Sequence, residues 1–349
     1  MFVSDFDFEL PKDRIAQAPS VEREASRLLV LDRGAGTLRH HRVTDLPRLL
    51  EPGDMLVLNE TRVFPARLLG RRVSGSGKAE CLLLARLKKN DHWDALLSPG
   101  RKLQVGTVLA FEDQGFRLNA EVLDCHAHGR RTVRLWTEDG TSVDDAIDRL
   151  GHVPLPPYVK RQDDSTDRER YQTVYARVRG SVAAPTAGLH LTTELLGQLQ
   201  ARDIEVRRLT LHVGYGTFQP IRVERVEDHQ VEPESYEIPD ETASAVTRAI
   251  RAGRRVVAVG TTTTRALETA YRKGDGLLQP GLGLSELYLY PGVRFHVVGG
   301  LLTNFHLPQS SLLMLVSAFA GWESIREAYA EALRQDYRFY SYGDAMLIL

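Results

Sequence analysis

Hydrophobic residues along this chain are arranged in two ways, as continuous apolar runs and as short alternating runs. Continuous runs of strand length predict strands that are buried on both faces, as in an α/β sheet. They occur at residues 27–31, 55–58 and 256–259. Further strands are expected at residues 39–43, 209–213, 287–290 and 295–298. Helical spacing appears at residues 45–50, 240–252, 265–271 and 310–318. The apolar C-terminal residues 347–349 are expected to pack on the core.

The hydrophobic pattern is different between residues 66 and 152. Short apolar runs there are separated by Gly, Asp and Asn, which favours an antiparallel sandwich or small barrel. The runs are residues 79–84, 93–97, 107–111, 116–123 and 131–136, and a closing helix is expected at 143–150. We predict an α/β (α+β) main domain with a mixed sheet and flanking helices, built from residues 1–65 and 153–349. The barrel-like all-β domain, residues 66–152, is inserted into it.

Composition narrows the functional classes. A length of 349 residues predicts about two domains. The net charge of −1 means that the whole protein has no positive electrostatic field that would attract nucleic acid. A local basic patch remains possible. Two cysteines, Cys81 and Cys125, form no CxxC pair, which favours a reducing cytoplasm. No run reaches membrane-spanning length, and the N-terminus lacks a signal-peptide core.

Residues 181–220 hold two small-residue turns, each with a histidine, joined by about one helix. Glycine just past a strand lets the backbone approach a ligand closely. We therefore expect the two turns to form the two lips of one cleft. The residues expected there are Thr186, Gly188, His190, His212, Gly214, Gly216 and Thr217.

Polar residues also follow three predicted strands, a usual position for a binding site in an α/β sheet. They are Asn59, Thr61 and Arg62, the threonines 261–264, and Thr303, Asn304 and His306. A helix beginning in the threonines suits an anion, although threonines also serve as N-caps. The first group could equally be a plain turn, and His306 a structural histidine.

Two charged segments leave alternatives open. Residues 160–170 are dense in charge and fit a solvated loop, or a lid or RNA-contacting segment. Residues 223–237 combine His229 with several carboxylates, but the spacing matches no metal template, so no metal is predicted.

Longer motifs resemble one family from end to end. They include DFDFELP (5–11), LVLNETRVFPARL (56–68), AAPTAGLHL (183–191), LHVGYGTFQP (211–220), LLTNFHLPQSSLLMLVSAFAG (301–321) and YSYGDAM (340–346). This pattern is similar to the S-adenosylmethionine:tRNA ribosyltransferase-isomerases of queuosine biosynthesis. Residues 73–148 match more loosely.

The resemblance implies a reaction. S-adenosylmethionine would donate its ribosyl group to 7-aminomethyl-7-deazaguanine at the wobble position of a tRNA with a GUN anticodon. Isomerisation would give epoxyqueuosine, with release of adenine and methionine. The donor is consumed as a substrate, so no cofactor is expected, and the partners are the donor and the tRNA. A monomer without membrane contact is expected.

The resemblance also implies roles for residues. His190, His212 and His306 are the expected catalytic histidines, with His190 and His212 nearest the reacting ribose. The expected substrate-binding residues are Asn59, Thr61, Arg62, Arg67, Thr186, Gly188, Gly214, Gly216, Thr217, Thr262, Thr303, Asn304, Tyr342 and Asp344. Of these, Asn59, Thr61, Arg62, Arg67, Tyr342 and Asp344 are placed at the rim. Arg62, Arg67 or the turn 261–264 could hold the methionine carboxylate.

Three positions depart from the family pattern, and two rival functions stay open. Glu232 stands where the family often has a second histidine, Gly299 where it usually has an aspartate, and threonines occupy 262–264. A non-catalytic RNA-binding protein would use the β domain as its platform. The tRNA contact itself is expected at the basic residues near Arg67, Arg71 and Arg72 and near Lys160 and Arg161. A methyltransferase would use the same donor but lacks the usual glycine-rich fingerprint.

Overall fold

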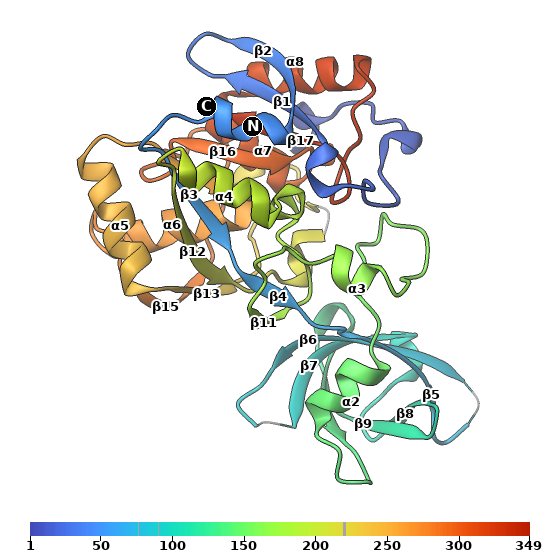
Figure 1. Cartoon of the computed structure of the whole chain (residues 1–349). Coiled ribbons are helices and arrows are strands. Elements are labelled where there is room, and N and C mark those ends of the chain that lie inside the picture. Colours follow the sequence, from blue (N-terminus) through green and yellow to red (C-terminus); the bar gives the residue numbers. More distant parts are fainter. Residues whose placement is uncertain (76, 90, 219–220) are drawn as a thin grey trace.

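The computed structural model describes residues 1–75, 77–89, 91–218 and 221–349, and these form two connected parts. Figure 1 shows a large sheet with its helices in the upper part and a β-barrel below it. The predicted fold class, a mixed α/β unit with a barrel-like all-β unit, is confirmed. None of the described helices is long and apolar enough to cross a membrane.

Nine strands of the described residues form one mixed sheet. In spatial order they are β15 (Gly281–Ser285), β13 (Glu234–Ile238), β12 (Glu205–Leu211), β3 (Met55–Asn59), β14 (Val256–Val259), β16 (Gly300–Asn304), β17 (Ala345–Ile348), β1 (Arg27–Asp32) and β2 (Thr37–Arg42). The four neighbours β12, β3, β14 and β16 run parallel, so their carboxyl ends meet at one edge. The C-terminal strand β17 lies between β16 and β1, which confirms that the apolar tail packs on the core.

Both faces of this sheet are covered by helices. Side chains alternate between the faces along a strand, so Val57 packs in one core and Leu56 and Leu58 in the other. The first core includes residues of α5 (Asp240–Arg251), α6 (Thr261–Lys273), α7 (Ser311–Ala320) and α8 (Trp322–Arg334). The second includes residues of α1 (Leu46–Leu49) and α4 (Thr193–Ala201). Burial on both faces explains why the central strands are continuous apolar runs.

The second part is a closed six-stranded antiparallel barrel. Its strands are β5 (Arg67–Arg72), β6 (Lys78–Arg86), β7 (His92–Ser98), β8 (Val108–Asp113), β9 (Phe116–Cys125) and β10 (Arg130–Trp136). The sequence pattern missed β5, whose alternation is interrupted by Gly70. Helix α2 (Val143–Leu150) follows, and its N-cap Ser142 accepts a hydrogen bond from the Asp145 amide. The boundaries at residues 66 and 152 stay a prediction.

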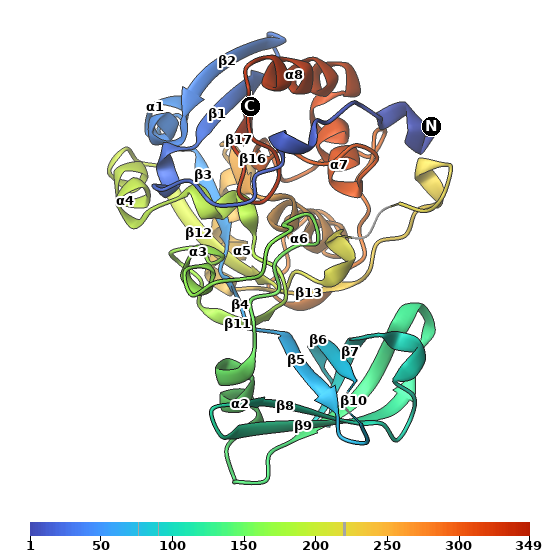
Figure 2. The ribbon, with the colours of Figure 1, turned by 90° about the vertical axis from the view of Figure 1, so that its right-hand side faces the viewer.

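Two short strands lie where the chain passes between the two parts. β4 (Thr61–Val63), which follows β3, pairs in parallel with β11 (Val178–Ser181), and α3 (Asp167–Arg170) precedes β11. Figure 2 shows β4 and β11 between the large sheet and the barrel. The chain therefore leaves and re-enters the large sheet close to the carboxyl end of β3.

The predicted strands at residues 287–290 and 295–298 are wrong, because side chains there take the bonds that a neighbouring strand would make. The buried carboxylate of Glu268 accepts the backbone N–H groups of His296, Val297 and Val298, at 2.9 to 3.1 Å. Arg265 donates to the carbonyl of Leu287 at 3.0 Å. Apolar alternation alone could not show that two helix side chains replace the ladder.

Candidate functional site

A cavity of about 470 Å³ opens at the carboxyl ends of β14 and β16. Residues 183–187 form one wall of the cavity, and Val213 and Thr217 form another part of the lining. Residues 260–262, 303–310 and 340–341 complete most of the lining, together with Asp7, Tyr158, Ile221 and Leu312. Both small-residue turns of residues 181–220 therefore contribute to one cavity.

The structure brings some of the predicted site residues together at this cavity and separates others. Those that line it are Thr186, Thr217, Thr262, Thr303, Asn304 and His306. Those outside its lining are Asn59, Thr61, Arg62, Arg67, Gly188, His190, His212, Gly214, Gly216, Tyr342 and Asp344. The assignment of these residues to catalysis or substrate binding stays a prediction in both groups. The groups differ in position, because only the first lines the cavity.

His306 is the imidazole that lines the cavity. It follows β16, and its Nε2 atom lies 2.8 Å from the Thr303 hydroxyl. Its backbone N–H donates to the Tyr329 hydroxyl at 3.0 Å, which fixes the turn before α7. Burial lowers the pKa of His306 to about 3, so the ring is neutral at physiological pH. A neutral imidazole at this wall can accept a proton or a hydrogen bond.

His190 lies behind the cavity wall and holds Asn304. The Asn304 Nδ2 atom lies 3.1 Å from the Tyr340 carbonyl, 3.4 Å from the Asp344 carbonyl and 3.1 Å from His190 Nε2, so its two hydrogens are shared among three neighbours. The carbonyls can only accept, which identifies this side of the amide as the NH₂ group, and an NH₂ group does not accept. His190 Nε2 is therefore the acceptor, and the neutral ring carries its proton on Nδ1. Burial, with the nearby Arg338 and Arg23, lowers the pKa of His190 to about 4.

This arrangement leaves the Asn304 oxygen buried beside the cavity without a partner in the described part of the chain. Asn304 is buried, its nitrogen is fully engaged, and its Oδ1 atom has no hydrogen-bond partner among the described residues. A buried acceptor without a partner costs about 1–3 kcal/mol, which a bound donor group would recover. We infer that His190 orients Asn304, and that Asn304 presents an acceptor to whatever occupies the cavity.

His212 belongs to a separate cluster at the ends of β3 and β12. Its Nδ1 atom lies 2.8 Å from the Thr61 hydroxyl, and its ring lies so close to Gly180 that a Cβ there would come within 2.6 Å. Burial lowers the pKa of His212. Asn59 is fully buried and its amide bonds both the N–H and the carbonyl of Leu211. These contacts tie two strand ends together.

The expected rim position is wrong for Asn59, Thr61, Tyr342 and Asp344, which are all buried. Asp344 accepts the backbone N–H groups of Arg27 and Arg338, so its carboxylate closes the C-terminal turn. Of the two arginines, Arg62 is exposed on β4, and Arg67 forms two bonds to Glu80 of the barrel, at 2.8 and 3.0 Å. Neither arginine lines the cavity.

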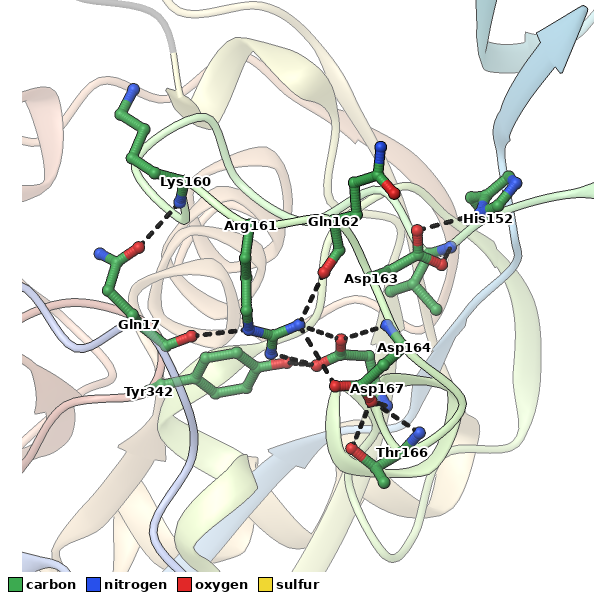
Figure 3. A network of polar contacts seen from close by, with 11 residues as sticks. Gln17, His152, Lys160, Arg161, Gln162, Asp163, Asp164, Thr166, Asp167 and Tyr342 are labelled. Atoms are coloured by element: carbon green, nitrogen blue, oxygen red, sulfur yellow. Dashed lines mark hydrogen bonds and ion pairs between the residues drawn. The ribbon is translucent and has the colours of Figure 1, made fainter.

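The charged segment 160–170 is built around a buried carboxylate, Asp167 (Figure 3). Arg161 donates to both Asp167 oxygens, at 2.6 and 2.8 Å, and Tyr342 donates to one of them at 2.8 Å. Burial acts to raise the pKa of Asp167, but the bonds from Arg161, the Asp164 amide and Tyr342 outweigh it and lower the pKa. The segment is therefore fastened to the C-terminal turn, which corrects the solvated-loop alternative for its buried part.

Several lining residues were missed by the sequence argument. Asp7 follows the short helix of residues 3–6 and faces the cavity, and Tyr340 and Ser341 come from the same motif as Tyr342. The Tyr340 hydroxyl is buried without a partner among the described residues. The motifs 5–11 and 340–346 signalled these regions, but the side chains that face the cavity depend on how each turn is wound.

Glu234 holds the turn that carries Thr217. Its Oε1 atom accepts the Gly214 N–H at 2.9 Å and the Thr217 hydroxyl at 3.1 Å, and its Oε2 atom accepts Arg265 at 2.6 Å. Glu234 and Arg265 are both buried. Gly214 and Gly216 thus lie in a turn that is positioned by a buried ion pair of β13 and α6 rather than by contact with the cavity.

We expect Glu234→Gln to lower the free energy of unfolding by about 3–5 kcal/mol, because it leaves the buried Arg265 charge without its counterion. Glu232→Gln is the matched control two residues away. Its partner Arg130 lies at 3.3 Å and both side chains are about one third exposed, so the loss should be below about 1 kcal/mol. Urea unfolding of the two variants measures both values, and equal losses would contradict the positioning role.

Charge and metal ligands are sparse at the cavity. Among its described lining residues, Asp7 supplies a carboxylate, and neither arginine nor lysine is present. In the described part of the chain, no group of three or more His, Cys, Asp or Glu side chains is placed to hold a metal ion. Helices α6 and α7 both begin at the wall, so their N-terminal N–H groups are local sources of positive potential.

Known proteins of one family match this sequence along essentially its whole length. Residues 3–348 match the family described as queuosine biosynthesis protein. S-adenosylmethionine:tRNA ribosyltransferase-isomerases from Symbiobacterium thermophilum and Desulfitobacterium hafniense are 50% and 48% identical, each over 100% of both chains. The crystal structure of an S-adenosylmethionine tRNA ribosyltransferase from Thermotoga maritima is 36% identical, with a TM-score of 0.55 over 99% of this chain and 100% of that one. This chain therefore belongs to the S-adenosylmethionine:tRNA ribosyltransferase-isomerase family of queuosine biosynthesis enzymes.

Proposed function

We propose that the enzyme transfers the ribosyl group of S-adenosylmethionine to 7-aminomethyl-7-deazaguanine at the wobble position of a tRNA with a GUN anticodon. Isomerisation of the ribose gives epoxyqueuosine, and adenine and methionine are released. The observation that carries the proposal is full-length family membership. A cavity of about 470 Å³ with buried polar atoms lacking partners lies at the carboxyl ends of two parallel strands. That volume is within the range of small-molecule sites.

The chemistry of the donor sets what the cavity must provide. A sulfonium acidifies the hydrogens on C5′, so a proton acceptor must reach that carbon. We assign this role to His306, which is neutral and faces the cavity. Proton transfer near neutral pH favours a base with a pKa close to 7, so the low pKa of His306 does not by itself favour the assignment, which rests on the position of the ring at the cavity wall. The sulfonium also supplies the activation for departure of methionine, so the proposal includes no metal or redox cofactor.

The proposal assigns two supporting roles. Asn304 offers its free oxygen to a hydroxyl or amino group of the donor, and His190 keeps Asn304 in place. The proposal also includes a monomer that acts on tRNA in the cytoplasm, with both lips of the cavity supplied by one chain.

We place the anticodon arm beside a second hollow of about 390 Å³, between barrel strands β5 and β6 and residues 154–162. Arg67 and Lys160 line it. Glu80 and Asp167 already engage Arg67 and Arg161, so Lys160 is the cation there that an RNA phosphate can reach most easily.

Release of adenine and methionine should require both the donor and a tRNA that carries the deazaguanine precursor. We expect stoichiometric release with that tRNA and at least about 100-fold less with the matched tRNA that carries guanine at the wobble position, because the amino acceptor is then missing. Chromatography of the released products and mass spectrometry of the tRNA measure this. A methyl-sized adduct would favour the methyltransferase, and tRNA binding without any product would favour the non-catalytic RNA-binding protein.

A further inference from the structure

The N-terminus of helix α6 forms part of the cavity wall. The helix has 13 residues, and its N-cap Gly260 provides no side chain to bond the first N–H groups. Gly260, Thr261 and Thr262 all line the cavity. The first N–H groups of a helix have no partner within it and carry partial positive charge, which favours an anion.

Thr262 is a second and independent sign of a ligand here. It is 6% exposed and lines the cavity, yet its hydroxyl has no hydrogen-bond partner among the described residues. The next two threonines differ, because Thr263 and Thr264 donate to the carbonyls of Val259 and Gly260 at 2.7 and 3.1 Å. A buried hydroxyl without a partner requires an explanation, and a molecule bound in the cavity would supply the missing partner.

Gly260 shapes this corner. Its φ of +92° belongs to the region that glycine tolerates and other residues rarely adopt. An added Cβ would lie 3.7 Å from the Thr262 hydroxyl and 3.8 Å from Ala187, so the backbone conformation, more than space, calls for glycine. The turn at Gly260 is what brings the start of α6 against the segment 183–187.

Cations that could compete for an anionic ligand lie elsewhere. Arg62 and Arg67, the two arginines that the sequence suggested, are outside the lining. Arg265 of the same helix is buried against Glu234 and two carbonyls. The described lining residues therefore stabilise a negative charge through helix N-termini and not through arginine or lysine. The start of α7 also lines the cavity, but its N-cap Ser310 already accepts the Leu313 N–H, whereas the N-cap Gly260 of α6 has no side chain. Asp7 suits the cationic part of a ligand.

We propose that the N-terminus of α6 and the Thr262 hydroxyl bind the α-carboxylate of the methionine moiety of S-adenosylmethionine. This inference rests on the proposed function, and it selects the helix over the two arginines. The carboxylate is the one negatively charged group of the donor, whose sulfur and amino group are positive and whose adenine and ribose are neutral. Asn304, an acceptor, is suited to the neutral or cationic part instead.

Thr262→Val tests this subsite by comparing two ligands, S-adenosylmethionine and its decarboxylated form, by calorimetry. The measurements use the matched tRNA that carries guanine at the wobble position, so that turnover does not consume the donor. We expect the Kd of S-adenosylmethionine to rise about 10-fold, as for loss of one bond to a charged group, and that of the decarboxylated form to change less than about twofold. Thr262→Ser, which keeps the hydroxyl, should restore most of the affinity for S-adenosylmethionine.

Thr269→Val is the matched control on the same helix. Thr269 is similarly buried, at 5% exposure, but its hydroxyl bonds Ser285 away from the cavity, so both affinities should stay at the wild-type value. Equal weakening of both ligands by Thr262→Val, or no weakening of either, would overturn the carboxylate subsite. Product formation on tRNA in that case would leave the proposed function intact, whereas a wild-type enzyme that binds neither ligand would overturn both.

Discussion

His306→Gln should lower kcat for ribosyl transfer by about 10²- to 10⁴-fold, the contribution typical of a positioned general base. Glutamine can retain the bond between the Nε2 position and the Thr303 hydroxyl, but it removes the ring that can take a proton. The Kd of S-adenosylmethionine should change less than about threefold, because the variant alters the reacting group and keeps the wall. Single-turnover release of adenine and calorimetric binding of the donor separate these two effects.

The other two histidines provide the comparison. His212→Gln should lower kcat less than about 10-fold, since His212 lies outside the cavity and bonds Thr61. His190→Leu removes the acceptor that orients Asn304, so it should raise the KM for the donor, and His190→Gln should restore it by accepting the same bond. The sequence placed His190 and His212 nearest the ribose. A 100-fold loss of kcat in His212→Gln, together with a near-normal kcat in His306→Gln, would support His212 as the residue nearest the ribose and contradict the assignment of His306.

The fold was predictable where one pattern decides burial. Strands β3 and β14 are apolar on both faces, and this pattern alone indicates the centre of an α/β sheet. Helix α2 was predicted at its observed bounds, because Gly151 follows it as a stop signal. The order of strands in the sheet was not predictable, because β17 reaches its place between β1 and β16 from the far end of the chain.

The candidate site shows the same division. Small residues in both turns of 181–220 indicated a cleft, and both turns do line one cavity. Which way each imidazole points was beyond the pattern. The contact with Asn304, and not the spacing of the turn, places His190 behind the wall. The close approach of Gly180 decides where the His212 ring fits. Contacts between distant segments set side-chain direction, and a single sequence does not display them.

Acidification should destabilise the enzyme through its buried neutral histidines. His190 and His306 have folded-state pKa values lowered to about 4 and about 3, against about 6.5 in an unfolded chain. Between pH 6.5 and pH 4 the unfolded state therefore binds more protons, so stability rises with pH in this window and falls as pH decreases. From pH 7 to pH 5 the two residues together should cost about 4 kcal/mol, measured by urea unfolding at each pH.

Replacing each histidine measures its contribution to the loss of stability between pH 7 and pH 5. The quantity compared is the change in unfolding free energy with pH, not the stability at one pH. His190→Gln and His306→Gln should each reduce the loss between pH 7 and pH 5 by about 2 kcal/mol, even if both variants are less stable throughout. Carboxylates such as Asp167, whose pKa is lowered, contribute below this window, so they do not mask the effect. Thr269→Val, which replaces a buried side chain that does not titrate in this range, is the control and should keep the wild-type loss. A pH dependence that neither buried variant reduces would mean that solvent reaches both rings, and the cavity wall would then not be the closed, neutral surface on which the assignment of His306 depends.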